Sequence, residues 1–341
     1  AKMRTFVVFG CLLASSQAFL APGLSLPQSK RVHSAKCAPS LRTRLAQPST
    51  ELQMGLFDGL TKGLESMIGA EEATGPNIAP KVDAAANVLT WNVGVSEIPD
   101  PRHPMEDAWF AGDFDFGVFD GVSGAAKSEF GELYSFQLSS TTYSMMRSQR
   151  EKRGFVEPEL ALEYAYGALT AAQAIGSTTA TTVSIDTKSE PGFTLLKGAN
   201  VGDSGVTVVR QGGEDGRPYV AYKTVPQMHY FNCPFQLGGG SPDTTDLATK
   251  IRCPLIAGDV VILASDGLYD NVYESQIIDL IEATVGQTPE VMAQALVGYA
   301  RQVQEDPNAY VPFGVEAAAA GKPWSGGKLD DTCVLVLQFQ Y

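Results

Sequence analysis

After about residue 80, short hydrophobic runs recur between polar segments, and this pattern predicts a β-rich domain. Short runs of β-branched and aromatic residues are bounded by Gly, Pro or Asp, which is typical of strands. We expect strands at 90–95, 107–111, 114–119, 178–185, 193–200, 205–210, 219–224, 259–264 and 332–339.

Helical patterns occur in pairs between these runs of strands. The segments 125–147 and 157–174 carry helix formers, and a second pair is expected at 275–284 and 289–304. Glu157-Pro158-Glu159 suits a first helical turn. Because strands come in consecutive runs and helices in pairs, the order predicts a layered α+β fold with antiparallel sheets, not alternating βαβ units.

The first 50 residues have the composition of a targeting leader. They contain seven Lys and Arg and no Asp or Glu, and a basic start is followed by an apolar run at 6–13 and small residues at 14–18. This is the order of a secretory signal, and the run is too short to span a bilayer. The acid-free, Ser- and Pro-rich remainder has transit-peptide composition. With Phe19 after the cleavage site, the two parts together resemble presequences for the complex plastids of algae; secreted and mitochondrial destinations are the alternatives.

Residues 51–80 connect this leader to the domain expected at 81–341. Apolar residues at 54–68 have helix-like spacing that Gly55, Gly59 and Gly63 weaken. A membrane-surface or partner helix and a segment packed on its own domain are both compatible with this pattern. The stretch 70–81 is a linker by composition.

The charge distribution bears on which partners the chain can bind. The formal charge is −13, and since residues 1–50 carry +7, the remainder carries −20. This acidic body argues against nucleic acid as a partner. At 44% hydrophobic residues the chain can bury a large core. Cys233, Cys253 and Cys333 form no CxxC pair or disulfide framework, which favours a reducing compartment.

Carboxylates are concentrated at the ends of predicted strands, where loops leave room for a ligand. An Asp-Gly pair alone usually marks only a turn. Several together suggest a site for a hard divalent cation, because Mg²⁺ takes oxygen ligands. The four clusters are Glu106-Asp107, Asp120-Gly121, Asp266-Gly267 and Asp330-Asp331.

These residues resemble the metal-dependent serine/threonine protein phosphatases of the type 2C family over about residues 90–339. The motifs are RHPMEDA from Arg102, DGVSG from Asp120, GSTTA from Gly176, ANVGDSG from Ala199, SDGLYDN from Ser265 and GGKLDDT from Gly326. Further stretches from His229 and Asp306 resemble the organellar branch of the family. The resemblance implies two antiparallel β-sheets sandwiched between pairs of α-helices.

The resemblance also implies the roles of single residues. Asp120 is expected between two Mn²⁺ or Mg²⁺ ions, and Asp203 matches a position linked to a weaker third ion. Asp331 is the second candidate at the Asp330 position, and a turn-forming role for Asp203 is the alternative. The remaining expected ligands are Asp266 and Asp330 on one ion, Glu106 and the carbonyl of Gly121 on the other, and Asp107 in support.

A mechanism follows from this chemistry. Two cations bridged by one carboxylate lower the pKa of a shared water, which attacks phosphorus in line. Arg102 matches the phosphate-holding Arg of the family; an ordinary surface Arg is the alternative. Val122 stands where many members have a His proposed to protonate the leaving group. We expect a water to replace it, with His103 and His229 as alternatives.

Two alternative functions have to be considered beside the phosphatase, a protease and a pseudophosphatase. Gly202-Asp203-Ser204-Gly205 superficially resembles a protease nucleophile loop, but no matching His motif accompanies it. A pseudophosphatase that only binds phosphoproteins is the second rival. The expected partners are proteins phosphorylated on Ser or Thr, with no nucleic acid, a peripheral thylakoid association by analogy, and a monomeric state.

Overall fold

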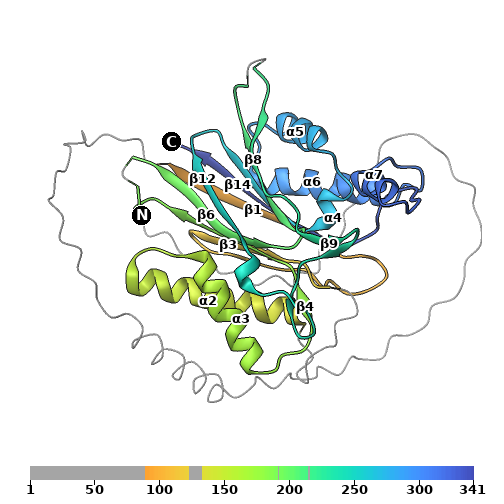
Figure 1. Ribbon diagram of the computed structural model, residues 1–341. Coiled ribbons are helices and arrows are strands. Elements are labelled where there is room, and N and C mark those ends of the chain that lie inside the picture. Colours follow the sequence, from red (N-terminus) through yellow and green to blue (C-terminus); the bar gives the residue numbers. More distant parts are fainter. Residues whose placement is uncertain (1–88, 123–132, 191, 214–215) are drawn as a thin grey trace, which may run out of the picture. The chain divides into compact units, whose positions relative to one another are not determined.

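The computed structural model describes residues 89–122, 133–190, 192–213 and 216–341 (Figure 1). The expected leader at 1–50 and the segment at 51–80 lie outside the described residues. So does the start of the helix expected at 125–147. The fold below is therefore that of the domain expected at 81–341.

The first antiparallel sheet joins the two ends of this domain. Its strand order is β1 (Thr90–Ile98), β14 (Thr332–Gln340), β13 (Val260–Ala264), β7 (Gly205–Arg210) and β8 (Tyr219–Lys223). β1 and β14 pair over nine positions, from Thr90 opposite Gln340 to Ile98 opposite Thr332. The last strand of the chain therefore lies in the middle of the sheet, where the apolar run at 332–339 can be buried on both faces.

The second sheet contains one strand that was not predicted. Its order is β12 (Thr249–Leu255), β6 (Thr194–Val201), β5 (Ala180–Asp186), β3 (Asp115–Phe119) and β2 (Ala108–Ala111). β12 contains Pro254, which lowers strand propensity but is tolerated at a sheet edge. Its exposure alternates strictly from Lys250 to Leu255, so the signal was in the period-two pattern. Two short pairs lie outside this sheet: β4 (Ser177–Thr178) with β11 (Leu237–Gly238), and β9 (Met228–Tyr230) with β10 (Cys233–Pro234).

Helices cover the outer faces of both sheets, as the layered prediction required (Figure 1). α2 (Tyr134–Arg153) and α3 (Pro158–Ala171) pack on the sheet that contains β3, whereas α6 (Pro289–Gln304) packs on β1 and β14. The helix expected to end at 147 runs on to Arg153, where Gly154 adopts a left-handed conformation and ends it. The other helical elements are η1 (Thr245–Leu247), α4 (Asp266–Tyr269), α5 (Glu274–Ala283) and α7 (Pro312–Ala319).

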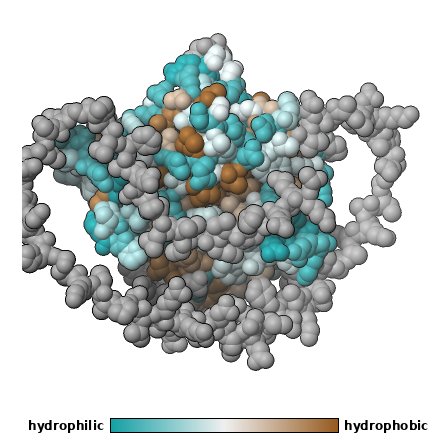
Figure 2. All heavy atoms as spheres, turned by 180° about the vertical axis from the view of Figure 1, so that it is seen from behind, coloured by the Kyte–Doolittle hydropathy of each residue, from teal (hydrophilic) through white to brown (hydrophobic). Residues whose placement is uncertain are grey.

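Three apolar clusters hold these layers together. The first lies between the sheets and includes Val118, Leu263 and Leu335, all fully buried. The other two lie beneath the α2–α3 pair and beneath the α5–α6 pair. On the face shown in Figure 2, hydrophobic residues gather in patches among hydrophilic ones.

Within the described residues, none of the helices combines the length and the apolar character needed to cross a bilayer. The cysteines Cys233, Cys253 and Cys333 are all free thiols. This agrees with the absence of a disulfide framework in the sequence.

Candidate metal and phosphate site

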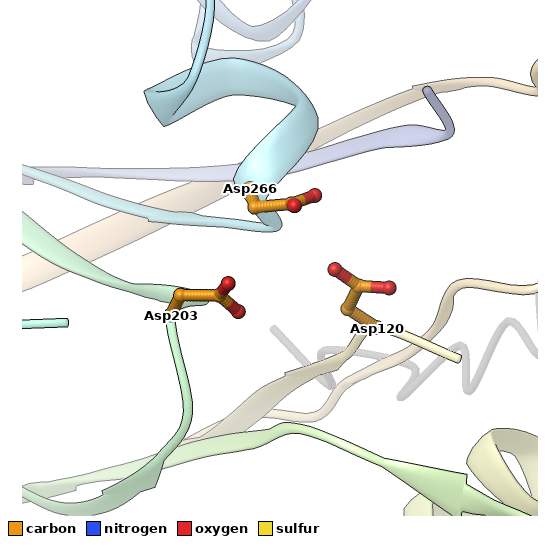
Figure 3. Close-up of side chains that lie close together, drawn as sticks. All are labelled: Asp120, Asp203 and Asp266. Atoms are coloured by element: carbon orange, nitrogen blue, oxygen red, sulfur yellow. The ribbon is translucent and has the colours of Figure 1, made fainter. Parts of the chain in front are cut away.

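The predicted carboxylates meet at one end of the sandwich. Asp120 follows β3, Asp203 lies in the turn between β6 and β7, and Asp266 follows β13 as the first residue of α4. Figure 3 shows the three side chains pointing toward one another. One oxygen from each lies within 4.8 Å of the others. Three separate segments of the chain thus contribute one carboxylate each to a single cluster.

Close packing explains the glycines that follow two of these aspartates. A Cβ on Gly121 would lie 2.4 Å from the carbonyl oxygen of Glu106, and a Cβ on Gly267 would lie 1.9 Å from that of Asp331. Neither glycine has a positive φ. The two Asp-Gly pairs are therefore not turn signals here. They let the strand ends approach closely enough for carboxylates from different sheets to converge.

Burial leaves several of these oxygens without protein partners. Among the described residues, Oδ1 of Asp203 and both carboxylate oxygens of Asp107 are buried without a hydrogen bond. Burial, followed by the charge of Asp266, raises the pKa of Asp203 to about 7. Burial and then Asp266 also raise the pKa of Asp120 well above its usual range. Unpartnered, crowded carboxylate oxygens fit a divalent cation with oxygen preference, which would displace their protons.

The two adjacent aspartates before β14 have different surroundings. Asp330 lines the central cavity, and burial, followed by Asp266, raises its pKa to about 6. Asp331 is buried, and its carboxylate accepts hydrogen bonds from the backbone N–H groups of Asp100 (2.6 Å) and Glu106 (2.7 Å). Asp330 is thus the better placed of the two to reach an ion, and its assignment as ligand stays a prediction.

Glu106 and Asp107 lie immediately before β2, beside Gly121. Ser135 of α2 donates a 2.5 Å hydrogen bond to the carbonyl oxygen of Glu106. Gly121 forms an isolated bridge with Thr178 and lines the cavity. The structure therefore brings the predicted ligands of the second ion to the same end of the sandwich as Asp120, while their direct ligation stays a prediction.

A cavity of about 550 Å³ opens above this cluster. Arg102 lies at its mouth, with 65% of its side chain exposed. Its Nε and Nη2 donate to the carboxylate of Asp100, and Nη2 also donates to the carbonyl oxygen of Leu329 at 2.8 Å. The guanidinium is thus held over the cavity by two partners, and no bond of Nη1 to a described residue is present. The residues that line the cavity include Arg102, His103, Asp120, Asp203, Asp266 and Asp330.

The histidine alternatives differ in position. Nε2 of His229 lies 3.0 Å from Asp243 Oδ2, and its ring centroid is 4.4 Å from that of Phe235. His229 is therefore packed and paired, as expected for a structural histidine. His103 lines the cavity, as does Val122. The hydroxyl of Ser204 is buried and pairs with Thr179 at 2.8 Å, which gives the protease interpretation no support.

Two charged residues of the site were missed in the sequence. Asp270 lies one helical turn after Asp266, so its spacing could have indicated it. Lys328 gave no such signal, because a Lys in a Gly-rich loop is usually solvated. Its Nζ lies 2.5 Å from Asp266 Oδ2, 2.6 Å from Asp270 Oδ2 and 3.1 Å from Asp330 Oδ2. Although burial opposes ionisation of Asp266, Lys328 holds the pKa of Asp266 below its usual value.

Known proteins are similar to this chain in sequence and in fold. The family described as "Protein phosphatase 2C" matches residues 256–308. The X-ray structure of the photosystem II phosphatase PBCP is 29% identical, covers 73% of this chain and 98% of its own, and superposes with a TM-score of 0.61. The catalytic domain of the phosphatase PstP, solved with two manganese ions, shares the fold at 18% identity and a TM-score of 0.52, over 74% of this chain and all of its own.

Relatives at the sequence level extend the match. Probable protein phosphatase 2C 1 of Oryza sativa subsp. japonica is 33% identical over 282 residues, which span 77% of this chain and 78% of the rice protein. The chain therefore belongs to the protein phosphatase 2C family and is a protein serine/threonine phosphatase.

Proposed function

We propose that the chain hydrolyses phosphoserine and phosphothreonine in proteins with two Mn²⁺ or Mg²⁺ ions at the Asp120 cluster. The observation that carries this proposal is the convergence of Asp120, Asp203 and Asp266 within 4.8 Å. When bound, such a pair of ions supplies Lewis acidity and a water nucleophile at neutral pH. The oxygen-only donor set favours these ions over Zn²⁺, which prefers His and Cys ligands.

Each residue has a distinct task in this proposal. Asp120 would hold both ions, and Asp266 and Asp330 would hold one of them. Glu106, Asp107 and the Gly121 carbonyl would hold the other ion, and Asp203 would contribute from the edge of the cluster. Arg102 would bind phosphate oxygens through Nη1, which has no hydrogen bond to a described residue, while Asp100 and the carbonyl oxygen of Leu329 hold Nε and Nη2. The cavity of about 550 Å³ admits a phosphorylated side chain.

Protonation of the leaving alkoxide needs a source other than residue 122. Val122 lines the cavity but carries no proton to donate. His229 is committed to Asp243 at 3.0 Å. We propose that a water in the cavity gives up this proton, because the polar walls and the open volume can hold one beside the cluster.

A phosphatase assay on the full chain tests the proposal. We expect turnover of phosphoserine and phosphothreonine peptides with Mn²⁺ or Mg²⁺ and none with excess chelator. Asp120→Asn and Asp266→Asn should abolish turnover, with the circular dichroism spectrum retained. The matched control is Asp246→Asn in η1, because this side chain is exposed and lies outside the cluster. Full turnover in chelator would refute metal dependence.

The same assay distinguishes an active phosphatase from a pseudophosphatase. All the expected carboxylates occur in the sequence, but Val122 replaces the His of many members. A pseudophosphatase would bind phosphopeptides with Mn²⁺ and release no phosphate. Measurable phosphate release that scales with enzyme concentration and disappears in Asp120→Asn would exclude it.

We further propose that the substrates are plastid phosphoproteins. Two observations support this: the leader-like composition of residues 1–50 and the similarity to a photosystem II phosphatase. A fluorescent fusion to residues 1–55 should enter the plastid, and Phe19→Ala should stall it in an earlier compartment. Secretion of the wild-type fusion into the medium would contradict this destination and remove the basis for a thylakoid substrate.

A further inference from the structure

Lys328 forms a tight cluster with three carboxylates. Its Nζ is 2.5 Å from Asp266 Oδ2, 2.6 Å from Asp270 Oδ2 and 3.1 Å from Asp330 Oδ2. Its side chain is only 14% exposed. An ammonium group has three N–H donors, and each here has one carboxylate oxygen as partner. Such complete pairing is what makes a buried charge tolerable.

The backbone of Lys328 is fixed by a second residue. Asn271 accepts from the N–H of Lys328 at 2.8 Å and donates to its carbonyl oxygen at 3.0 Å. The preceding Gly327 packs so closely on α6 that a Cβ would lie 2.2 Å from the carbonyl oxygen of Val303. The ammonium is therefore placed by a rigid loop before any ligand arrives.

The wall around the ammonium is rigid as well. Nζ of Lys328 lies 5.1 Å from the ring centroid of Phe313, and the backbone N–H of Phe313 donates to the carbonyl oxygen of Asp270 at 3.0 Å. The Phe313 ring in turn packs edge-on against Trp324, with centroids 4.8 Å apart. An aromatic face favours a cation above it. The space between the three carboxylates and the Phe313 ring therefore suits one monovalent cation at the end of a side chain.

We propose that the ammonium of Lys328 permanently occupies the cation position between Asp266, Asp270 and Asp330, in place of a third divalent ion. A divalent ion there would have to take the same carboxylate oxygens at about 2.0–2.6 Å and would lie beside the displaced positive charge. Lys328 leaves the other side open, because Oδ1 of Asp203 and both oxygens of Asp107 have no partner among the described residues. The inference rests on the proposed two-metal function and fixes its ion count.

Counting bound Mn²⁺ tests this role without relying on activity. Chelator-treated full chain is titrated with Mn²⁺ in a calorimeter, and the free ion is followed by electron paramagnetic resonance. We expect two ions per wild-type chain and three per Lys328→Met chain, since methionine keeps the length of the side chain and removes the charge. Three ions on the wild type, or two on Lys328→Met, would overturn the proposal.

Matched variants make the outcome specific. Lys322→Met removes a lysine that lies 5.2 Å from the ring centroid of Phe231 in the same aromatic region, and we expect it to bind two ions. Lys328→Met combined with Asp270→Asn should return from three ions to two. If Lys328→Met fails to fold, Lys328→Gln, which also removes the charge, is titrated instead: three bound ions support the proposal and two overturn it.

The role proposed for Lys328 and the proposed phosphatase function can be refuted independently of each other. Phosphopeptide hydrolysis by the wild-type chain with Mn²⁺ establishes the activity whatever the stoichiometry. An active wild type with an unchanged count in Lys328→Met removes only the role of Lys328. Two tightly bound ions without hydrolysis would instead remove the proposed function and leave the assignment of Lys328 intact.

Discussion

The carboxylate of Asp331 accepts a 2.7 Å hydrogen bond from the backbone N–H of Glu106, although 225 positions separate the two residues. Its other oxygen accepts a 2.6 Å hydrogen bond from the N–H of Asp100. One buried side chain before β14 therefore fixes both ends of the loop that carries Arg102 and leads into β2. The loop with Arg102, which we propose binds phosphate, and the proposed ligand Glu106 are thus held by the same side chain.

This pairing predicts different roles for the two adjacent aspartates. Asp331→Ala should lower the free energy of unfolding of the metal-free protein by about 3–6 kcal/mol, because it removes two hydrogen bonds to a charged group, which contribute roughly 1.5–3 kcal/mol each. Asp330→Asn should mainly weaken Mn²⁺ binding. Urea unfolding in chelator and Mn²⁺ titration measure the two effects. The reverse result, with Asp331 controlling affinity and Asp330 stability, would exchange the assignments.

Arg102 is expected to act on the phosphate. Arg102→Ala should reduce kcat/KM for a phosphopeptide about 10- to 1000-fold, because a charge-assisted pair to the phosphate is lost. Arg102→Lys should restore part of this, since an ammonium keeps the charge but not the fork. The control is Arg217→Ala, an exposed arginine paired with Asp279 and Glu282. An unchanged kcat/KM in Arg102→Ala would show that Arg102 is an ordinary surface arginine with no role in phosphate binding.

Asp186 tests an ion pair at the end of β5, in a part of the fold that the proposed mechanism does not use. Although burial opposes ionisation, Lys197 at 2.6 Å and the N–H groups of Lys188 and Ser189 lower its pKa. A lowered pKa stabilises the fold above the unfolded value near 3.9. Asp186→Asn should therefore cost about 1–3 kcal/mol of unfolding free energy at pH 7.

The cost of this substitution should shrink as the pH falls below about 4, because the carboxyl of Asp186 in the unfolded wild-type chain then takes up a proton while the native carboxylate stays ionised. Urea unfolding of both proteins at pH 7 and at the lowest pH where they fold measures this difference. A difference that is independent of pH would show that the charge of Asp186 contributes nothing.

Much of the fold could be predicted from local pattern. Strand runs such as 332–339 and 259–264 consist of contiguous apolar residues that only a buried strand or helix accommodates, and flanking Gly and Asp decide between the two. The edge strand β12 was not predicted; it contains Pro254, and its polar residues Thr249, Lys250 and Arg252 interrupt the apolar run. The short helix α7 begins with Pro312, and its small Ala-rich sequence has little amphipathic pattern to detect.

The candidate site was predictable in its carboxylates but not in its lysine. Residues such as Asp120 and Asp266 stand next to strands in a motif, so their convergence follows from sheet topology. The contacts of Lys328 depend on how a loop packs on α6 and on Asn271, and no local pattern encodes this. The role of Asp331 could not be predicted either. In the sequence, an aspartate that accepts hydrogen bonds from backbone N–H groups cannot be distinguished from an aspartate that binds a metal ion.

The raised pKa values at the site predict an unusual pH dependence for the metal-free protein. Burial and neighbouring carboxylates raise the pKa of Asp203 to about 7 and that of Asp330 to about 6. Between pH 4 and 7 the native state therefore binds more protons than the unfolded state, whose carboxyls titrate near 3.9. Stability must then fall as the pH rises through this window. We expect the melting temperature in chelator to decrease from pH 5 to pH 8.

Asp203→Asn isolates the contribution of one group to this slope. The neutral amide should leave the metal-free protein about 1–3 kcal/mol more stable than the wild type at pH 8 and close to it at pH 5. Saturating Mn²⁺ should reverse the trend for the wild type, because ion binding competes with protons for the same oxygens and strengthens as the pH rises. Equal stability of Asp203→Asn and wild type at both pH values would mean that Asp203 is ionised in the metal-free protein and is not held under strain by its neighbours.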